Sequence, residues 1–225
     1  MLTKSNIDFV IDKSRAEGVG DMTNEIFPNH FLGLICGKPG SGKTTLLKFI
    51  LKSDKLLFKK FDYVYIISPS FQEYKSLYLP ESNFTNELDF EWMNNKISAL
   101  KNTLAYTNVL FIFDDCLVDL FKNRFSKNIM EFIFNRRHKL NNGMISILMT
   151  SQKYNFIPTA IRSNLTLIIS FKLNNRDWKL IKDEIIFMDA NFDDVLNYVF
   201  DSDDAFFVYR IDKNIFFKKF DKLAI

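Results

Sequence analysis

Short apolar runs recur along this 225-residue chain and predict the strands of a buried sheet. The runs show no alternation of apolar and polar positions, so water should touch neither face of the sheet. This pattern is typical of a parallel sheet with helices on both sides. The five runs are Phe31–Cys36, Tyr63–Ile67, Val109–Phe113, Met144–Met149 and Leu165–Phe171.

Segments with the apolar spacing of amphipathic helices lie between and after these runs. They are Thr45–Leu51, Phe90–Leu104, Ile129–Leu140, Pro158–Arg162, Asp177–Phe187 and Phe192–Tyr198. Two late apolar runs, Ala205–Tyr209 and Ile215–Phe217, predict an antiparallel hairpin at one edge of the sheet. Residues 71–89 are polar and turn-rich, and we expect a surface excursion there. The pattern therefore indicates an α/β fold.

A glycine-rich loop joins the first predicted strand to the first predicted helix. Residues 37–44 fit the pattern G-x-x-x-x-G-K-[ST], and Thr45 opens the helix that follows. Glycines let the backbone approach a phosphate, and the N–H groups of the first helical turn point at it. The alternative is a glycine-rich turn that matches by chance. The expected nucleotide-binding residues are Gly37, Lys38, Pro39, Gly40, Ser41, Gly42, Lys43, Thr44 and Thr45.

Within this loop, Lys43 and Thr44 have distinct expected roles toward ATP and Mg²⁺. Lys43 supplies a positive charge to the β- and γ-phosphates, and the Thr44 hydroxyl is a ligand for Mg²⁺. Asp114 and Asp115 end the third strand, at the edge of the sheet where ligands of parallel α/β folds bind. We expect Asp114 to hold Mg²⁺ opposite Thr44, and Asp115 to orient the water that attacks the γ-phosphorus. The alternative for this pair is a helix N-cap.

Other polar residues are candidates for completing the site. Gln152 follows the fourth strand, and it either hydrogen-bonds the attacking water or the γ-phosphate or is an ordinary polar residue at a strand end. Phosphoryl transfer also gains from an arginine, often one from a neighbouring subunit. Arg136, Arg137 and Arg162 are candidates for this trans finger. The alternatives are charges at a helix C-terminus for the first two and a carboxylate or phosphate partner for Arg162.

The order of these motifs resembles the DNA-packaging ATPases of large DNA viruses and virophages, which are poxvirus-type members of the FtsK–HerA superfamily of DNA translocases. The resemblance covers residues 30–172 and rests on Gly-x-x-Gly-Ser-Gly-Lys-Thr, Phe-Ile-Phe-Asp-Asp, Arg-Arg-His, Thr-Ser-Gln and Ile-Pro-Thr-Ala-Ile-Arg-Ser-Asn. It implies a RecA-like ASCE P-loop fold, ATP and Mg²⁺ as cofactors, and a homo-oligomeric ring, with a hexamer favoured. It also implies double-stranded DNA and a capsid portal or vertex as partners.

Carried over by position, the resemblance gives roles to individual residues. Lys43 and Thr44 match the ATP and Mg²⁺ residues, Asp114 the Mg²⁺ acid, Asp115 the catalytic acid and Gln152 the polar sensor. Asp115 stands where many of these translocases carry Glu, and its shorter side chain leaves the position of the water open. Arg137 is weakly favoured over Arg162 as the trans finger.

Four other functions are alternatives for a glycine loop in a chain of this length. A nucleoside or nucleotide kinase is disfavoured by the paired acids and by Gln152, which suit attack by water. A P-loop ATPase of DNA replication or segregation is a further alternative. A GTP-dependent switch lacks its guanine motif, since Asn174–Asp177 has no lysine and instead predicts a helix start. A non-catalytic nucleotide-binding subunit is disfavoured by the intact Lys43 and acid pair.

Composition and charge narrow the class of protein only a little. Hydrophobic residues make up 47% and charged residues 25%, with a formal net charge of +3, which is too small to indicate nucleic-acid binding by itself. The two cysteines should be buried and reduced, and their spacing from the histidines does not fit a zinc site. Lys59, Lys60, Lys218 and Lys219 could face DNA, but a solvated rim is the favoured interpretation.

We expect no membrane span and no signal peptide, hence a soluble, intracellular protein, located in a virus factory or at a virion vertex if the viral resemblance holds. We divide the chain into a lead-in (1–29), a P-loop ATPase core (30–189) and an extension of the same domain (190–225).

Overall fold

The computed structural model describes residues 10–11, 25–53, 56–116, 126–187, 192–202 and 204–224. Most of the predicted lead-in and the predicted boundary at 189–190 lie outside these residues. The strands are β1 (Val10–Ile11), β2 (Leu32–Cys36), β3 (Tyr63–Ile67), β4 (Phe84–Thr85), β5 (Thr107–Phe113), β6 (Gly143–Ser151), β7 (Leu167–Ser170), β8 (Phe207–Arg210), β9 (Ile215–Lys218) and β10 (Asp221–Ala224).

The α-helices are α2 (Lys43–Lys52), α3 (Phe90–Lys101), α5 (Ser126–Asn135), α6 (Thr159–Arg162), α7 (Asn175–Ile185) and α8 (Phe192–Val199). Short 3₁₀ helices connect them: η2 (Phe71–Leu77), η3 (Glu81–Asn83), η4 (Arg136–His138), η5 (Tyr154–Phe156) and η6 (Ile211–Lys213). No helix within the described ranges combines the length and the apolar character that crossing a bilayer requires.

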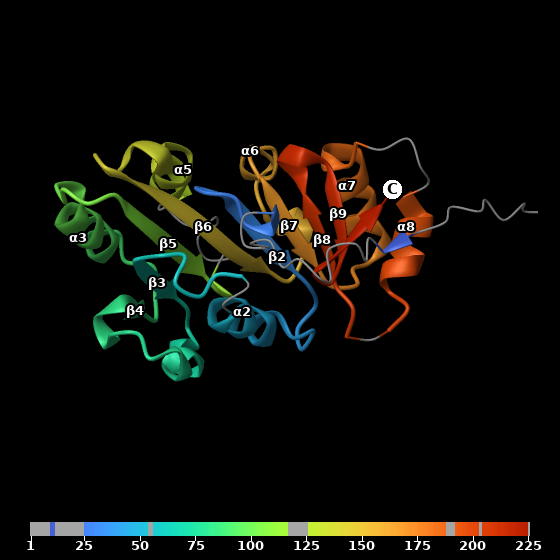
Figure 1. Ribbon diagram of the computed structural model, residues 1–225, viewed down its shortest axis with the longest axis horizontal. Coiled ribbons are helices and arrows are strands. Elements are labelled where there is room, and N and C mark those ends of the chain that lie inside the picture. The colour runs from blue at the N-terminus through green and yellow to red at the C-terminus, as the bar shows by residue number, and fades with distance from the viewer. Residues whose placement is uncertain are drawn as a thin grey trace, which may run out of the picture.

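One ten-stranded sheet runs through the molecule in the order β1-β10-β9-β8-β7-β2-β6-β5-β3-β4 (Figure 1). The strands from β7 to β4 are parallel, and β8, β9, β10 and β1 extend the sheet in antiparallel fashion. The five predicted core strands and the terminal hairpin are confirmed. The order β7-β2-β6-β5-β3 inserts β6 between the strand before the glycine loop and the strand before the acid pair. This is the RecA-like ASCE arrangement expected from the resemblance.

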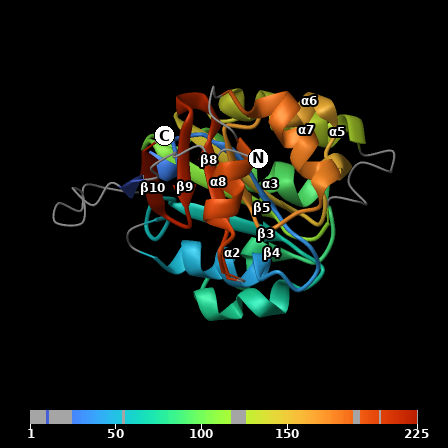
Figure 2. The same cartoon turned by 90° about the vertical axis from the view of Figure 1, so that its right-hand side faces the viewer.

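Apolar side chains cover both faces of this sheet, as the uninterrupted apolar runs predict. Helices α3, α5, α6, α7 and α8 pack on one face, and α2 and η2 pack on the other (Figures 1 and 2). Alternate residues of a strand enter opposite cores: Phe111 joins the first cluster, and Leu110 and Ile112 join the second. Cys36 and Cys116 are buried, as expected, and are not joined in a disulfide.

Two helices end earlier than their apolar spacing predicts. Helix α3 stops at Lys101, and the Thr103 hydroxyl donates to the Leu100 carbonyl at 2.9 Å. Leu104, which the sequence assigns to the apolar face, is instead 98% exposed. Helix α5 gives way after Asn135 to the 3₁₀ turn η4, five residues before the predicted end. Helix ends are decided by caps and by packing, which apolar spacing does not encode.

The predicted surface excursion at 71–89 is partly wrong. It contains η2, η3 and β4, and Tyr74 of η2 is completely buried against α2 and the sheet. Phe71, Tyr74 and Leu77 recur at the three-residue spacing of a 3₁₀ helix, but the polar residues between them and Pro80 favoured a surface excursion. The buried hydroxyl of Tyr74 reaches Asp114.

Replacing Gly143 with Ala should lower the free energy of unfolding by about 1–3 kcal/mol, because an added Cβ would lie 2.2 Å from the Thr107 carbonyl oxygen. Strand β5 would have to shift, since the obstacle is backbone. Gly33→Ala is the matched control in the neighbouring strand: its Cβ would meet the flexible end of Leu148 at 2.9 Å. Urea unfolding of both variants checks this, and an equal or smaller loss for Gly143→Ala would contradict it.

Candidate functional site

The carboxyl ends of β2, β5 and β6 meet at one edge of the sheet, and a pocket of about 360 Å³ lies there. The strand order explains why the predicted residues converge: Gln152 follows β6, which lies between the glycine loop after β2 and the acids after β5. The lining residues are Pro39, Gly40, Gly42, Lys43, Thr44, Thr45, Ser70, Glu73, Asp114, Asp115 and Gln152.

The glycine loop has the backbone conformation that its sequence predicts. Gly40 and Gly42 have φ angles of 74° and 93°, which side chains other than glycine rarely adopt. At Gly37 the reason for glycine is space, because an added Cβ would lie 2.5 Å from Ser41 Oγ and 3.0 Å from Phe171 Cβ. Helix α2 starts at Lys43 with no acidic residue in its first turn. Its free N–H groups and dipole therefore favour an anion.

The Lys43 side chain lies along the loop. Its Nζ donates to the carbonyl oxygens of Gly37 at 2.8 Å and Lys38 at 3.1 Å. Burial lowers the pKa of Lys43, and the negative charge of Asp115, followed by smaller contributions that include Asp114, opposes this shift. An ammonium group held by neutral carbonyls beside two carboxylates is suited to binding a phosphate.

Asp114 is buried, and hydroxyl groups surround its carboxylate. Oδ2 accepts from Tyr74 at 2.6 Å and lies 3.5 Å from the hydroxyls of both Thr44 and Ser68, and Oδ1 accepts from Thr150 at 2.8 Å. Burial is the main cause that raises the pKa of Tyr74, followed by the charge of Asp114. The phenol therefore remains a donor across the physiological pH range.

Asp115 differs from its neighbour in exposure and in backbone conformation. It faces the pocket, its φ angle is 53°, and its backbone N–H donates to Thr150 Oγ1 at 2.9 Å. Gln152 Nε2 donates to Asp115 Oδ1 at 3.2 Å. The structure thus brings the exposed acid and the predicted polar sensor into direct contact.

The donor set around Thr44 and Asp114 fits Mg²⁺. No group of three His, Cys, Asp or Glu side chains within the described ranges could hold a metal by itself. Thr44 Oγ1, in the first turn of α2, and Asp114 Oδ2, directly after β5, are hard oxygen donors 3.5 Å apart. Mg²⁺ takes few protein ligands and completes its shell with water and phosphate oxygens. These two residues are therefore sufficient as its protein ligands beside a nucleotide.

The candidate arginines lie away from this pocket. Arg136 and Arg137 belong to η4, which precedes the amino end of β6, whereas the pocket lies beyond its carboxyl end. Arg136 is buried and donates to the carbonyl oxygens of Ile133 and His30. Burial, with a smaller contribution from Arg137, lowers the pKa of Arg136 to about 10. Arg137 is exposed.

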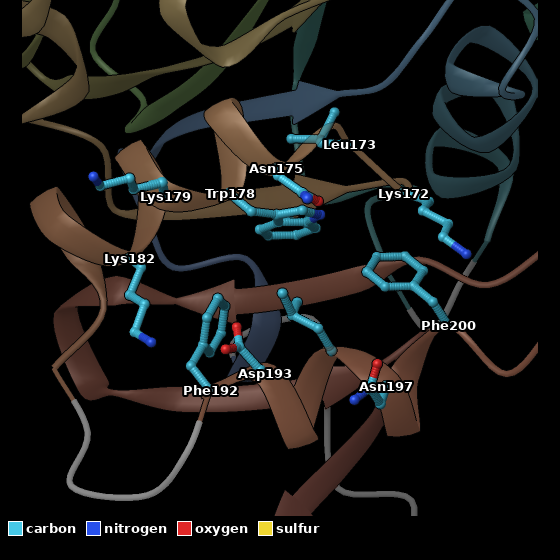
Figure 3. A pocket seen from close by; sticks show the side chains of 11 residues that line it. Lys172, Leu173, Asn175, Trp178, Lys179, Lys182, Phe192, Asp193, Asn197 and Phe200 are labelled. Atoms are coloured by element: carbon cyan, nitrogen blue, oxygen red, sulfur yellow. The ribbon is translucent and has the colours of Figure 1, made fainter.

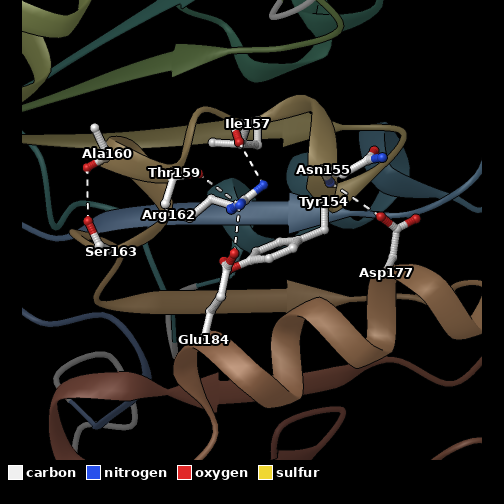
Figure 4. A network of polar contacts seen from close by, with 9 residues as sticks. All are labelled: Tyr154, Asn155, Ile157, Thr159, Ala160, Arg162, Ser163, Asp177 and Glu184. Atoms are coloured by element: carbon white, nitrogen blue, oxygen red, sulfur yellow. Dashed lines mark hydrogen bonds and ion pairs between the residues drawn. The ribbon is translucent and has the colours of Figure 1, made fainter.

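Arg162 is held within its own chain (Figure 4). Its Nη2 forms an ion pair with Glu184 at 2.6 Å and donates to Thr159 Oγ1 at 3.0 Å, and its Nη1 donates to the Ile157 carbonyl. The guanidinium group also lies 5.1 Å from the centre of the Tyr154 ring. These contacts match the alternative noted from the sequence, a carboxylate partner for Arg162.

Several residues of the site were missed in the sequence. Ser70 and Glu73 line the pocket from the segment around η2, and Glu73 forms an ion pair with Lys48 at 3.6 Å. Tyr74 and Thr150 contact Asp114 directly. Only Thr150 carried a sequence signal, as the first residue of the Thr-Ser-Gln motif. The others lie in or beside η2, in a segment whose polar, turn-rich composition predicted a surface excursion.

A second and larger cavity, of about 550 Å³, lies between α7 and α8 (Figure 3). Trp178 forms part of its apolar wall, and Lys172, Lys179 and Lys182 lie around it. Its lining contains neither a glycine loop nor a carboxylate pair. The smaller pocket is therefore the candidate active site, because the phosphate-binding backbone and the acids meet there.

The fold and the pocket together define a P-loop ATPase of the RecA-like ASCE class. The sequence model of the Poxvirus A32 protein family matches residues 22–223, and the chain belongs to this family. The resemblance to poxvirus-type packaging ATPases is thereby confirmed. A search of curated proteins found no match.

Solved structures support the assignment of the fold. The DNA-packaging ATPase B204 of Sulfolobus Turreted Icosahedral Virus superposes with a TM-score of 0.58 at 17% identity, over 84% of this chain and 97% of that one. The genome packaging NTPase B204 of Sulfolobus turreted icosahedral virus 2, in complex with ATP-gammaS, gives 0.57 at 16% identity, over 84% and 95%. At this identity the likeness concerns the fold.

Proposed function

We propose that this protein is an ATP-driven translocase that packages double-stranded viral DNA into a preformed capsid. The observation that carries the proposal is the convergence of Lys43, Thr44, Asp114, Asp115 and Gln152 on one pocket. Family membership and the similarity to packaging NTPases support the choice of DNA as partner. The corresponding site of action is the virus factory or the virion vertex.

In this proposal the glycine loop and the start of α2 bind the phosphates of ATP, and Lys43 moves from the loop carbonyls to the β- and γ-phosphates. Thr44 and Asp114 hold Mg²⁺. When bound, this ion neutralises charge on the phosphate oxygens and orients them for in-line attack. Asp115 accepts a hydrogen bond from the attacking water and orients it toward the γ-phosphorus. Gln152, which donates to Asp115, fixes the direction of that carboxylate.

Water is the proposed acceptor because of the chemistry around Asp115. An exposed carboxylate that accepts a hydrogen bond from the side-chain amide of Gln152 suits a small nucleophile such as water. This arrangement disfavours the kinase alternative. An ATPase of DNA replication or segregation would share the same site and the same stimulation by DNA. A measurement of DNA entering a capsid would separate it from a packaging ATPase.

A ring of subunits is part of the proposal, with a hexamer favoured. Strand β6 has nine residues, so Arg137 and the pocket of the same chain are about 25–30 Å apart. A flexible arginine cannot span that distance within one subunit. Arg137 therefore acts, if it is the finger, on the pocket of a neighbour in a head-to-tail ring, an arrangement that closes by rotation.

Phosphate release from ATP, with and without double-stranded DNA, tests the proposal. We expect Mg²⁺-dependent release of inorganic phosphate that rises several-fold with duplex DNA, because the motor couples the two. A nucleoside mixture serves as the acceptor control for the kinase alternative. Transfer of the γ-phosphate to a nucleoside, or release that duplex DNA leaves unchanged, would contradict the translocase.

A further inference from the structure

Two of the hydroxyl groups around Asp114 are close enough for short hydrogen bonds. Tyr74 donates to Oδ2 at 2.6 Å and Thr150 donates to Oδ1 at 2.8 Å, and both residues are fully buried. Each oxygen of the carboxylate is thus anchored from a different direction: Tyr74 comes from η2 and Thr150 from the end of β6. The plane of the Asp114 carboxylate is fixed by these two anchors.

Thr150 makes a second contact, and this one reaches the neighbouring acid. While its hydroxyl proton is directed at Asp114, its Oγ1 accepts the backbone N–H of Asp115 at 2.9 Å. A single hydroxyl can donate once and accept as well, so both contacts are compatible. Thr150 therefore connects the carboxylate of one acid to the backbone of the next.

The backbone of Asp115 has an uncommon conformation that this contact stabilises. Its φ angle of 53° lies in the left-handed region, which residues other than glycine seldom adopt, although Asp and Asn do so more readily than most. Strand β5 ends at Phe113, and the left-handed turn directs Asp115 into the pocket while Asp114 stays buried. The bond to Thr150 is a contact that holds the Asp115 amide in this turn.

We infer that Thr150 is a positioning residue for ATP hydrolysis: its hydroxyl sets the Asp114 carboxylate and the Asp115 backbone at the same time. This inference rests on the proposed function, because it assigns the alignment of the two acids to one side chain. Thr150 does not touch the reacting atoms. It acts through Asp115, whose distance from the attacking water depends on the turn.

Replacing Thr150 with Val tests the inference, because Val keeps the shape and removes the hydroxyl. We expect kcat for ATP hydrolysis to fall about 10–100-fold with KM for ATP unchanged within about threefold, since the glycine loop is untouched. Thr150→Ser keeps the hydroxyl and should retain kcat within about threefold of the parent. Hydrogen exchange of the Asp115 amide, measured without nucleotide, should accelerate in Thr150→Val and not in Thr150→Ser.

Thr107→Val is the matched control. Thr107 is a buried threonine at the opposite end of β5, and its hydroxyl donates to the Ala105 carbonyl at 3.1 Å. Its replacement should leave kcat unchanged. Equal kcat for the parent and Thr150→Val, or equal losses in Thr150→Val and Thr150→Ser, would overturn the inference. A parent without phosphate release would overturn the proposed function instead, and amide exchange at Asp115 would still decide whether Thr150 holds the turn.

Discussion

Replacing Asp115 with Asn is expected to reduce kcat for ATP hydrolysis by about 10²–10⁴-fold, the usual contribution of a positioned acid or base. Asn has nearly the same shape and tolerates a left-handed backbone, so the φ angle of 53° should persist. What is lost is the negative charge that orients the water. Binding of ATP should weaken only a few-fold, because Lys43 and the loop remain.

The same substitution has a second electrostatic effect. The charge of Asp115 opposes the lowering of the Lys43 pKa by burial, so its removal should lower that pKa further. Binding of a fluorescent ATP analogue, followed from neutral to alkaline pH, should therefore weaken at a lower pH in Asp115→Asn than in the parent.

Glu73→Gln is the matched control for Asp115→Asn. Glu73 is another exposed carboxylate lining the same pocket, and it already pairs with Lys48. If water is oriented by Asp115, phosphate release by Glu73→Gln should stay within about threefold of the parent. A loss of 10²-fold or more in Glu73→Gln, with near-parental activity in Asp115→Asn, would transfer the catalytic role to η2.

Replacing Arg137 with Ala should reduce phosphate release by about 10³-fold, the lower end for an arginine finger, without changing the stability of the subunit. The side chain is exposed, so its removal should alter the free energy of unfolding by less than about 0.5 kcal/mol. The loss should appear only where subunits assemble, because Arg137 cannot reach the pocket of its own chain.

Arg162→Ala should mainly lower the free energy of unfolding, whereas Arg137→Ala should mainly lower the rate of phosphate release. It removes the partner of Glu184 together with the contacts to Thr159 and Tyr154. Loss of one partner of a fully buried ion pair costs about 3–5 kcal/mol, and the 27% exposure of the Glu184 side chain reduces this to about 2–3 kcal/mol. Thermal unfolding and phosphate release, measured on both variants, separate a structural arginine from a catalytic one.

Mixed rings give the sharpest test of the trans role. A Lys43→Ala subunit keeps Arg137, and an Arg137→Ala subunit keeps Lys43, so each can complete the other. In a random mixture roughly a quarter of the head-to-tail interfaces combine an intact pocket with an intact arginine. Activity should therefore return on mixing two inactive variants. No recovery, in rings shown by light scattering to contain both, would exclude Arg137 as the finger.

The sequence by itself determined the buried core strands, the terminal hairpin and the edge of the sheet where the pocket lies. Uninterrupted apolar runs encode strands buried on both faces, and the glycine loop and the paired acids each follow such a run. The helix η2 was missed, because the short three-residue spacing of Phe71, Tyr74 and Leu77 lies in a stretch that is otherwise polar and turn-rich. The early ends of α3 and α5 were missed for a related reason: local caps decide them.

Tertiary structure alone decided how the predicted residues relate to one another. The order β2-β6-β5 puts Gln152 beside Asp115, and only packing brings Tyr74 and Thr150 onto Asp114. The arginines show most clearly the difference between what the sequence predicts and what packing decides. The sequence favoured Arg137 only weakly over Arg162, whereas packing buries Arg162 against Glu184 and leaves Arg137 exposed at the far edge. Contacts between residues distant in the chain depend on three-dimensional packing, which local sequence patterns do not record.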